Sequence, residues 1–251
     1  MIAENLAHLR AKIEETCNRA GRNPNEVKLI AVSKYFGVDS IIEAKNCGLT
    51  DFGENRAQEL TLKYEKIGDS VVWHMIGTLQ KNKVKYAVNA ARLIHSVDSL
   101  ELVEEINKRA EKINKVQKIL LEVKTSEEET KSGLETENEI LSLVKRCSEL
   151  KNIELKGLMT MAPLTEDANI IRKSFRDLRN WTPIIMDESY IVGDTVFVGA
   201  FYSRNFKKIG GAILNSTFTS FISEIYGRVN LGDGLLTTYG PELSKFLMLK
   251  P

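Results

Sequence analysis

The sequence predicts an α/β barrel of the (β/α)8 type, in which about six β-α units can be recognised before residue 180. Two observations predict this fold class. Short apolar runs rich in branched residues, which are typical of buried parallel strands, alternate with segments of helical periodicity. The alternation also repeats at the spacing of β-α units. Because a closed barrel of this class needs eight strands, the pattern lacks the last two units.

The first predicted element is a helix. Apolar residues from Ile2 to Cys17 recur at spacings of three and four, and Gly21 is placed to end it. Residues 27–33 (VKLIAVS) form the first predicted strand, and residues 41–47 return to helical periodicity. Further strands are predicted at 51–53, 72–77, 93–97, 119–123 and 155–159.

Two later helix starts resemble capping boxes, Asp98-Ser-Leu-Glu101 and Thr136-Glu-Asn-Glu139. Another helix is predicted at about residues 165–178, and after residue 180 the pattern changes. We therefore expect two regions: 1–180 as the barrel region, and 181–251 as an α+β tail of different origin.

The tail is predicted to contain a β-rich segment at 190–199 with a Gly-Asp turn, a helix at 212–226 and a glycine-rich loop at 227–234. A barrel that lacks two strands would leave unpaired edges and an exposed apolar interior. Either the β-rich part of the tail covers that gap, or the first region folds poorly.

Composition excludes several classes of protein. The 251 residues carry a net charge of +1, from 35 basic and 34 acidic side chains, so the chain has no bulk attraction to nucleic acid or anionic membranes. Three widely spaced cysteines without a C-x-x-C pair favour neither a disulfide framework nor a zinc site. No signal core or membrane-length apolar run is present. We expect a cytoplasmic protein without a metal.

Polar residues follow the predicted strands, where active groups of parallel barrels lie. Partial desolvation at a barrel mouth lowers the pKa of a lysine, and the free amine condenses with aldehydes to a Schiff base. Lys34 is the sharpest candidate, although a strand-end lysine that reaches solvent is the commoner case. Asn55 either hydrogen-bonds a planar ligand or, more commonly, caps the next helix. His74 and His95 are acid-base or structural groups, and Met161 packs on a ring or fills the core.

Six segments together resemble the pyridoxal phosphate homeostasis protein family, whose barrel is of the alanine-racemase N-terminal type. They occur in the family's order and spacing over about residues 1–180. These segments are AVSKY (31–35), FGENRAQ (52–58), HMIGTLQKNK (74–83), IHSVDS (94–99), KSG (131–133) and GLMTMAP (157–163).

The resemblance implies that Lys34 holds pyridoxal 5′-phosphate (PLP) as a Schiff base. It places Asn55, of the family's Gly-Glu-Asn motif, near the cofactor, and Met161 along the ring face. It also implies a role in PLP homeostasis, in which the cofactor is buffered or delivered to PLP-dependent apoenzymes. The family has no well-established turnover, and the racemases' second domain with its catalytic tyrosine is missing. No catalytic residue and no racemase activity are therefore predicted.

The family's phosphate-binding loops, which follow the last two strands of such barrels, are not found. Gly210-Gly211 and Gly232-Asp-Gly234 are glycine-rich, but neither stands between a convincing strand and a helix. The tail instead resembles the C-terminal region of adenine-specific DNA methyltransferases of restriction-modification systems. The segments that carry this likeness are LNS (214–216) and YGRVNLGDGL (226–235).

The catalytic Asn-Pro-Pro-Tyr motif and the methyl-donor loop of those enzymes are absent, so methyl transfer is not predicted. Two alternatives to PLP homeostasis stay open. One is a DNA-contacting module that uses Arg204, Lys207, Lys208 and Arg228. The other is a hybrid chain with impaired PLP binding.

Overall fold

The computed structural model of the chain describes residues 2–19, 21, 23–125, 132–163, 165, 167–187, 196–199 and 212–215. A helix and six β-α units follow one another along most of this length. In chain order they are α1 (Ile2–Arg19), β1 (Lys28–Val32), α2 (Val38–Asn46), β2 (Asp51–Glu54), α3 (Ala57–Ile67), β3 (Val72–Met75), α4 (Val84–Ala90), β4 (Leu93–Val97), α5 (Leu100–Glu111), β5 (Gln117–Glu122), α6 (Glu137–Glu149), β6 (Ile153–Thr160) and α7 (Ala168–Asp187). Short 3-10 helices lie at η1 (Pro24–Glu26), η2 (Gly68–Ser70) and η3 (Lys81–Lys83).

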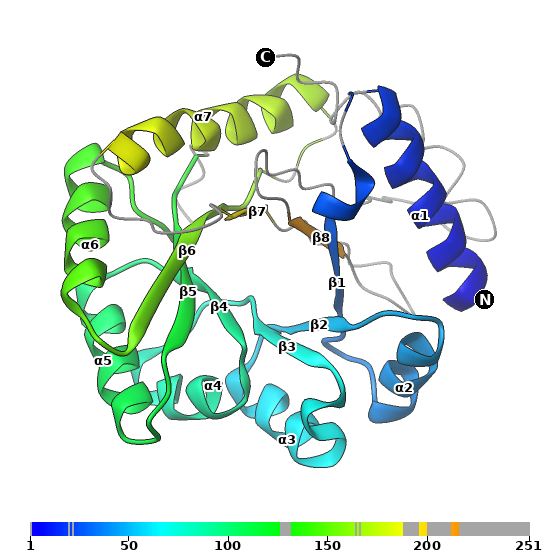
Figure 1. Ribbon diagram of the computed structural model, residues 1–251, viewed down its shortest axis with the longest axis horizontal. Helices are drawn as coiled ribbons and strands as arrows, with labels where there is room; N and C mark the ends of the chain where they lie inside the picture. The colour runs from blue at the N-terminus through cyan, green and yellow to red at the C-terminus, as the bar shows by residue number, and fades with distance from the viewer. Residues whose placement is uncertain are drawn as a thin grey trace.

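The strands β1 to β6 pair in parallel with their neighbours in chain order, and the helices lie outside them (Figure 1). Each strand alternates between a face toward the helices and a face toward the barrel axis. Phe52 and Trp73, for example, belong to the large outer core. A smaller interior cluster contains Ile30, Val32, Ile76, Leu93, Leu120 and Met159. The predicted alanine-racemase-like α/β barrel is thus confirmed.

Two short strands from the tail complete the sheet. The strand β7 (Val196–Gly199) pairs in parallel with β6, and β8 (Ala212–Asn215) pairs antiparallel with β1. The two end strands contact each other, so the eight-stranded sheet curves round into a barrel (Figure 1). Of the two expectations for the gap, coverage by the β-rich segment is confirmed for β7, whereas β8 comes from the segment that was predicted to be a helix.

The helix predicted at 212–226 is wrong at its start, because residues 212–215 form β8. The edge of β1 presents backbone N–H and C=O groups that need partners, and this tertiary pairing overrides a local helical pattern. The rest of that helix, the loop at 227–234, residues 190–195 and both glycine pairs lie outside the described residues. The helix predicted at 165–178 is found as α7 and continues beyond residue 180.

One of the two predicted capping boxes is confirmed. The Thr136 hydroxyl accepts from the Glu139 N–H at 3.3 Å, and the Glu139 carboxylate accepts from the Thr136 N–H at 2.9 Å. At the start of α5 the cap residue is Ser99, and its side chain makes no capping hydrogen bond. The Asp98 box is therefore wrong, because the helix begins one residue later than that motif requires.

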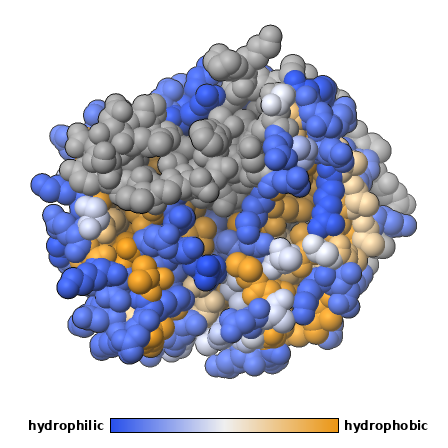
Figure 2. Space-filling model, viewed as in Figure 1, coloured by the Kyte–Doolittle hydropathy of each residue, from blue (hydrophilic) through white to orange (hydrophobic). Residues whose placement is uncertain are grey.

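The surface seen in the view of Figure 1 is mixed in polarity. Hydrophilic residues line much of its outer edge, and hydrophobic residues are grouped between them (Figure 2). Within the part of the chain that the structure describes, no helix is both long and apolar enough to cross a membrane.

Candidate functional site

Lys34 lies at the C-terminal end of β1, inside a tight turn. Only 5% of the residue is exposed. The turn spans residues 33–36 and is closed by the Phe36 N–H, which donates to the Ser33 carbonyl at 3.0 Å. Tyr35, its third residue, has a φ of 71°. This is the pattern of a type II turn, which normally has glycine at that position. The backbone on both sides of Lys34 is thus held in one defined conformation.

A buried ion pair lies directly behind this turn. Glu54 ends β2 and is fully buried, and its Oε1 accepts from the Ser33 hydroxyl at 2.6 Å and from Lys63 Nζ at 2.6 Å. Lys63 also donates to the Ser33 carbonyl at 2.9 Å. Burial raises the pKa of Glu54, and the hydrogen bonds from Lys63 and Ser33 act in the opposite direction. We call Ser33, Glu54 and Lys63 the Ser33 clamp.

Asn55 follows the clamp glutamate and is half-buried. The next helix, α3, has Arg56 as its N-cap, without a side-chain capping bond, so the interpretation of Asn55 as a helix cap is wrong. Its position is fixed instead by close backbone packing. A Cβ at Gly77, just after β3, would lie 2.5 Å from the Asn55 carbonyl oxygen. Only glycine allows the two connections to approach this closely.

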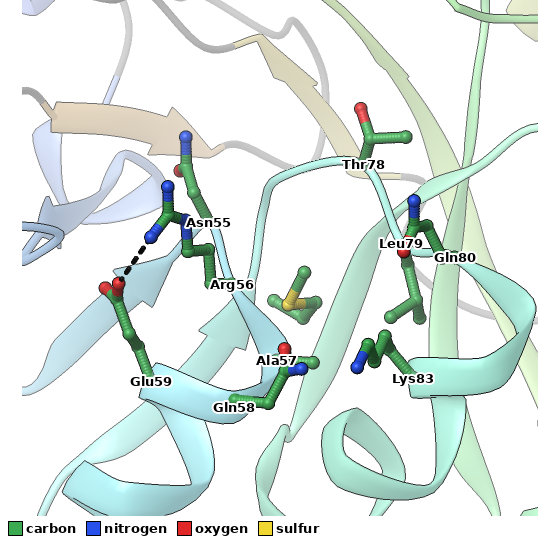
Figure 3. Close-up of a pocket in the computed structure, with 10 residues that line it drawn as sticks. Asn55, Arg56, Ala57, Gln58, Glu59, Thr78, Leu79, Gln80 and Lys83 are labelled. Atoms are coloured by element: carbon green, nitrogen blue, oxygen red, sulfur yellow. Dashed lines mark hydrogen bonds and ion pairs between the residues drawn. The ribbon is translucent and has the colours of Figure 1, made fainter.

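A cavity of about 550 Å³ opens between the β2–α3 and β3–α4 connections (Figure 3). Arg56 lies on one wall, paired with Glu59 at 3.4 Å, and Lys83 lies on the other. The lining residues are Asn55, Arg56, Ala57, Gln58, Glu59, Met75, Thr78, Leu79, Gln80 and Lys83. Neither Lys34 nor Met161 lines it. Of the three predicted site residues, only Asn55 lines this cavity.

Met161 follows the last residue of β6 and is half-buried. It packs against the interior cluster, to which Val32 of β1 belongs. Thr160 beside it donates to the Val123 carbonyl at 2.7 Å and lies 2.8 Å from the Thr125 hydroxyl. The structure thus brings Lys34, Asn55 and Met161 to the same end of the barrel, at the carboxyl ends of β1, β2 and β6.

His74 and His95 lie elsewhere, in a polar chain that crosses four strands and is buried from Asp51 to His95. Lys28 Nζ and His74 Nε2 each lie 3.0 Å from Asp51 Oδ1, and His74 Nδ1 lies 2.9 Å from His95 Nε2. The carboxylate can only accept, so His74 carries its proton on Nε2 and accepts from His95 Nε2–H. His95 Nδ1 has no hydrogen-bond partner among the described residues.

Burial lowers the pKa of both imidazoles, for His95 well below its usual range. Hydrogen bonds from His74, Thr50 and Lys28 outweigh the opposing effect of burial and hold the pKa of Asp51 at about 2. The pair is therefore neutral near pH 7 and has a structural role in the barrel interior.

The expectation that polar residues gather where the strands end did not include Lys63, which lies in α3. One signal was present. Lys63 stands three residues after the buried Leu60, where the helical pattern predicts an inward-facing position. No comparable sequence pattern predicts that His74 contacts Asp51 and His95. Among the described residues, no group of three or more His, Cys, Asp and Glu side chains is arranged to hold a metal ion.

The sequence of this chain is similar to those of known proteins. A family model for the N-terminal domain of alanine racemase matches residues 5–187. The pyridoxal phosphate homeostasis protein of Aquifex aeolicus is 46% identical over 177 residues, which cover 70% of this chain and 77% of the relative. That of Schizosaccharomyces pombe is 30% identical over 228 residues, which cover 87% of this chain and 94% of the relative.

Similar solved structures agree with these sequence matches. PipY of Synechococcus elongatus, whose structure has PLP bound, is 30% identical with a TM-score of 0.68, and the match covers 82% of this chain and 90% of PipY. The alanine racemase of Clostridium difficile is 14% identical with a TM-score of 0.62, covering 80% of this chain and 50% of that one. This second likeness shows the fold alone.

Proposed function

We propose that this chain, which belongs to the pyridoxal phosphate homeostasis proteins and shares their alanine-racemase N-terminal barrel, binds PLP through Lys34 and serves PLP homeostasis. The observation that carries the proposal is the burial of Lys34 in a fixed turn at the barrel mouth. A buried amine at that place is shielded from water and open to an aldehyde that enters the barrel end.

The residues around Lys34 fit the aldehyde end and the ring of this cofactor. The lysine amine would bond the aldehyde carbon to form a Schiff base, while the carbonyl oxygen leaves as water. The apolar side chain of Met161 would pack on the ring, and the Asn55 amide would hydrogen-bond a polar substituent. We assign no described residue to the phosphate group.

We further propose that PLP-dependent apoenzymes receive the cofactor and that the protein acts in the cytoplasm. No catalytic residue is part of this proposal. To buffer or deliver PLP, the protein must bind the cofactor reversibly through Lys34. This function requires no acid-base group beside the ring.

The origin of residues 181–251 and the division of the chain near residue 180 stay a proposal. DNA contact is not the function that we favour, because the relatives that match the chain are pyridoxal phosphate homeostasis proteins. The basic residues proposed for that contact, Arg204, Lys207, Lys208 and Arg228, lie outside the described residues. The strands β7 and β8 are also part of the barrel sheet. The match to the Schizosaccharomyces pombe protein covers 87% of the chain, so it includes residues beyond 180.

The test is an absorbance titration of the purified protein with PLP, followed by borohydride reduction and peptide mass analysis. We expect a long-wavelength band and a trapped adduct on Lys34, both lost in Lys34→Ala. Lys45→Ala, which removes an exposed lysine of α2, is the matched control and should behave like the native protein. A native protein that gives no band, or an adduct spread over surface lysines, would refute the proposal.

A further inference from the structure

The turn that presents Lys34 stores backbone strain. Tyr35 adopts a φ of 71° although it is not glycine. A side chain in this region crowds its own backbone, and such residues persist only where the surrounding structure fixes them. Burial of the ring does not supply that fixation, because Tyr35 is 76% exposed. Hydrogen bonds to Ser33, at the start of the turn, provide a restraint that burial does not.

Ser33, the first residue of the turn, is restrained at every polar group. Its N–H donates to the Gly53 carbonyl at 2.9 Å, and its hydroxyl donates to Glu54. Its carbonyl accepts two donors, the Phe36 N–H of the turn itself and Lys63 Nζ. Three of these four bonds reach residues of β2 or α3, outside the turn.

The clamp is largely shielded from water. Glu54 is fully buried, and the Lys63 side chain is 12% exposed. Hydrogen bonds that involve a charged group are stronger than neutral ones, and a low local dielectric strengthens them further. Lys63 Nζ donates both to the Glu54 carboxylate and to the Ser33 carbonyl, so one side chain of α3 links β2 to the turn.

We propose that Glu54 and Lys63 are positioning residues for Lys34: by holding Ser33, they maintain the strained turn that keeps Lys34 buried at the barrel mouth. This inference rests on the proposed function of Lys34. It assigns a role to the glutamate next to Asn55, and to a helix residue far from β1 in the sequence. Neither side chain is required to touch the cofactor.

The experiment compares Lys63→Met with Lys63→Arg, and Lys66→Met serves as the control because Lys66 is an exposed lysine of the same helix. Two readouts are used. One is PLP affinity by absorbance titration. The other is labelling of Lys34 in the cofactor-free protein by an amine acylating reagent, measured by peptide mass. We expect Lys63→Met to weaken PLP binding about ten-fold and to increase Lys34 labelling. Lys63→Arg and Lys66→Met should stay near the native values.

Relief of the strain provides the decisive comparison. Glycine at position 35 accepts the positive φ without cost, so a turn with Tyr35→Gly no longer depends on the clamp. Tyr35→Gly alone serves as the reference, because it also removes the ring whose centroid lies 5.7 Å from Lys34 Nζ. Adding Lys63→Met to Tyr35→Gly should lower PLP affinity by less than about three-fold and increase Lys34 labelling little, in contrast to the effect of Lys63→Met in the native protein.

Several outcomes would overturn the inference. Native PLP binding by Lys63→Met would do so, and so would a loss of the same size in the Tyr35→Gly background. If Lys63→Met does not fold, Ser33→Ala removes only the hydroxyl contact to Glu54 and should lower PLP affinity several-fold, and by less in the Tyr35→Gly background. Absence of a Lys34 adduct in the native protein would instead refute the proposed function, and the labelling readout would still report on the clamp.

Discussion

Replacing Asp51 by asparagine should remove a defined part of the protein's acid sensitivity. Burial alone would raise the pKa of Asp51, but hydrogen bonds from His74, Thr50 and Lys28 hold it at about 2, below the ordinary 3.8. A depressed pKa in the folded state stabilises the fold fully above the unfolded value, and this stabilisation is lost as the pH falls from 3.8 towards 2. At about 1.36 kcal/mol per pKa unit, the loss is roughly 2 kcal/mol.

The assay is urea unfolding of the native protein and Asp51→Asn at a series of pH values between 7 and 2.5. The native protein should be the more stable at neutral pH, and its advantage should shrink by roughly 1.5 kcal/mol between pH 4.5 and 2.5, with the rest lost below pH 2.5. Asp39→Asn, which removes an exposed carboxylate of α2, is the control. An advantage that stays constant across this window would show that the Asp51 hydrogen bonds do not stabilise the fold as argued.

Two further substitutions test the local structure by the same unfolding assay. Gly77→Ala should cost about 1–3 kcal/mol of stability, because the added Cβ would overlap the Asn55 backbone. Gly37→Ala is the control: its Cβ would have nothing within 4 Å, and it should change stability by less than about 1 kcal/mol. Equal effects of the two substitutions would contradict the close approach of Gly77 to Asn55. Thr136→Ala should cost about 1 kcal/mol through loss of the capping box with Glu139, and Thr136→Ser should retain most of it. A neutral Thr136→Ala would show that the box contributes nothing.

The barrel was largely predictable because its signals are local in the sequence. The run at 27–33 is short, apolar and branched, and it forms β1 with nearly the predicted bounds. Buried parallel strands carry this pattern on both faces, so it survives without knowledge of their partners. The rim position of Lys34 follows from the same rule, since polar residues after such strands gather at one end of a barrel.

Features that depend on distant partners were not predictable. Ala212–Asn215 carries no strand signal strong enough to outweigh its helical pattern, and it becomes β8 because β1 offers an unpaired edge. The contact of Lys63 with Ser33 spans 30 positions in the chain, and that of His74 with Asp51 spans 23. The sequence alone does not distinguish a lysine or histidine that is exposed to water from one that pairs with a buried carboxylate.

The same distant partners determine what Lys34 can do. The strand that ends at this lysine is paired on one side with β2 and on the other with β8 of the tail, from Lys28 opposite Asn215 to Ala31 opposite Ala212. Beyond the strand, the turn is strained at Tyr35 and is held by α3 through Lys63. The position of Lys34 thus depends on residues 51–67 and 212–215, which lie far from it in the chain. The tail therefore matters to the site through the sheet, without supplying a residue to which we assign cofactor contact.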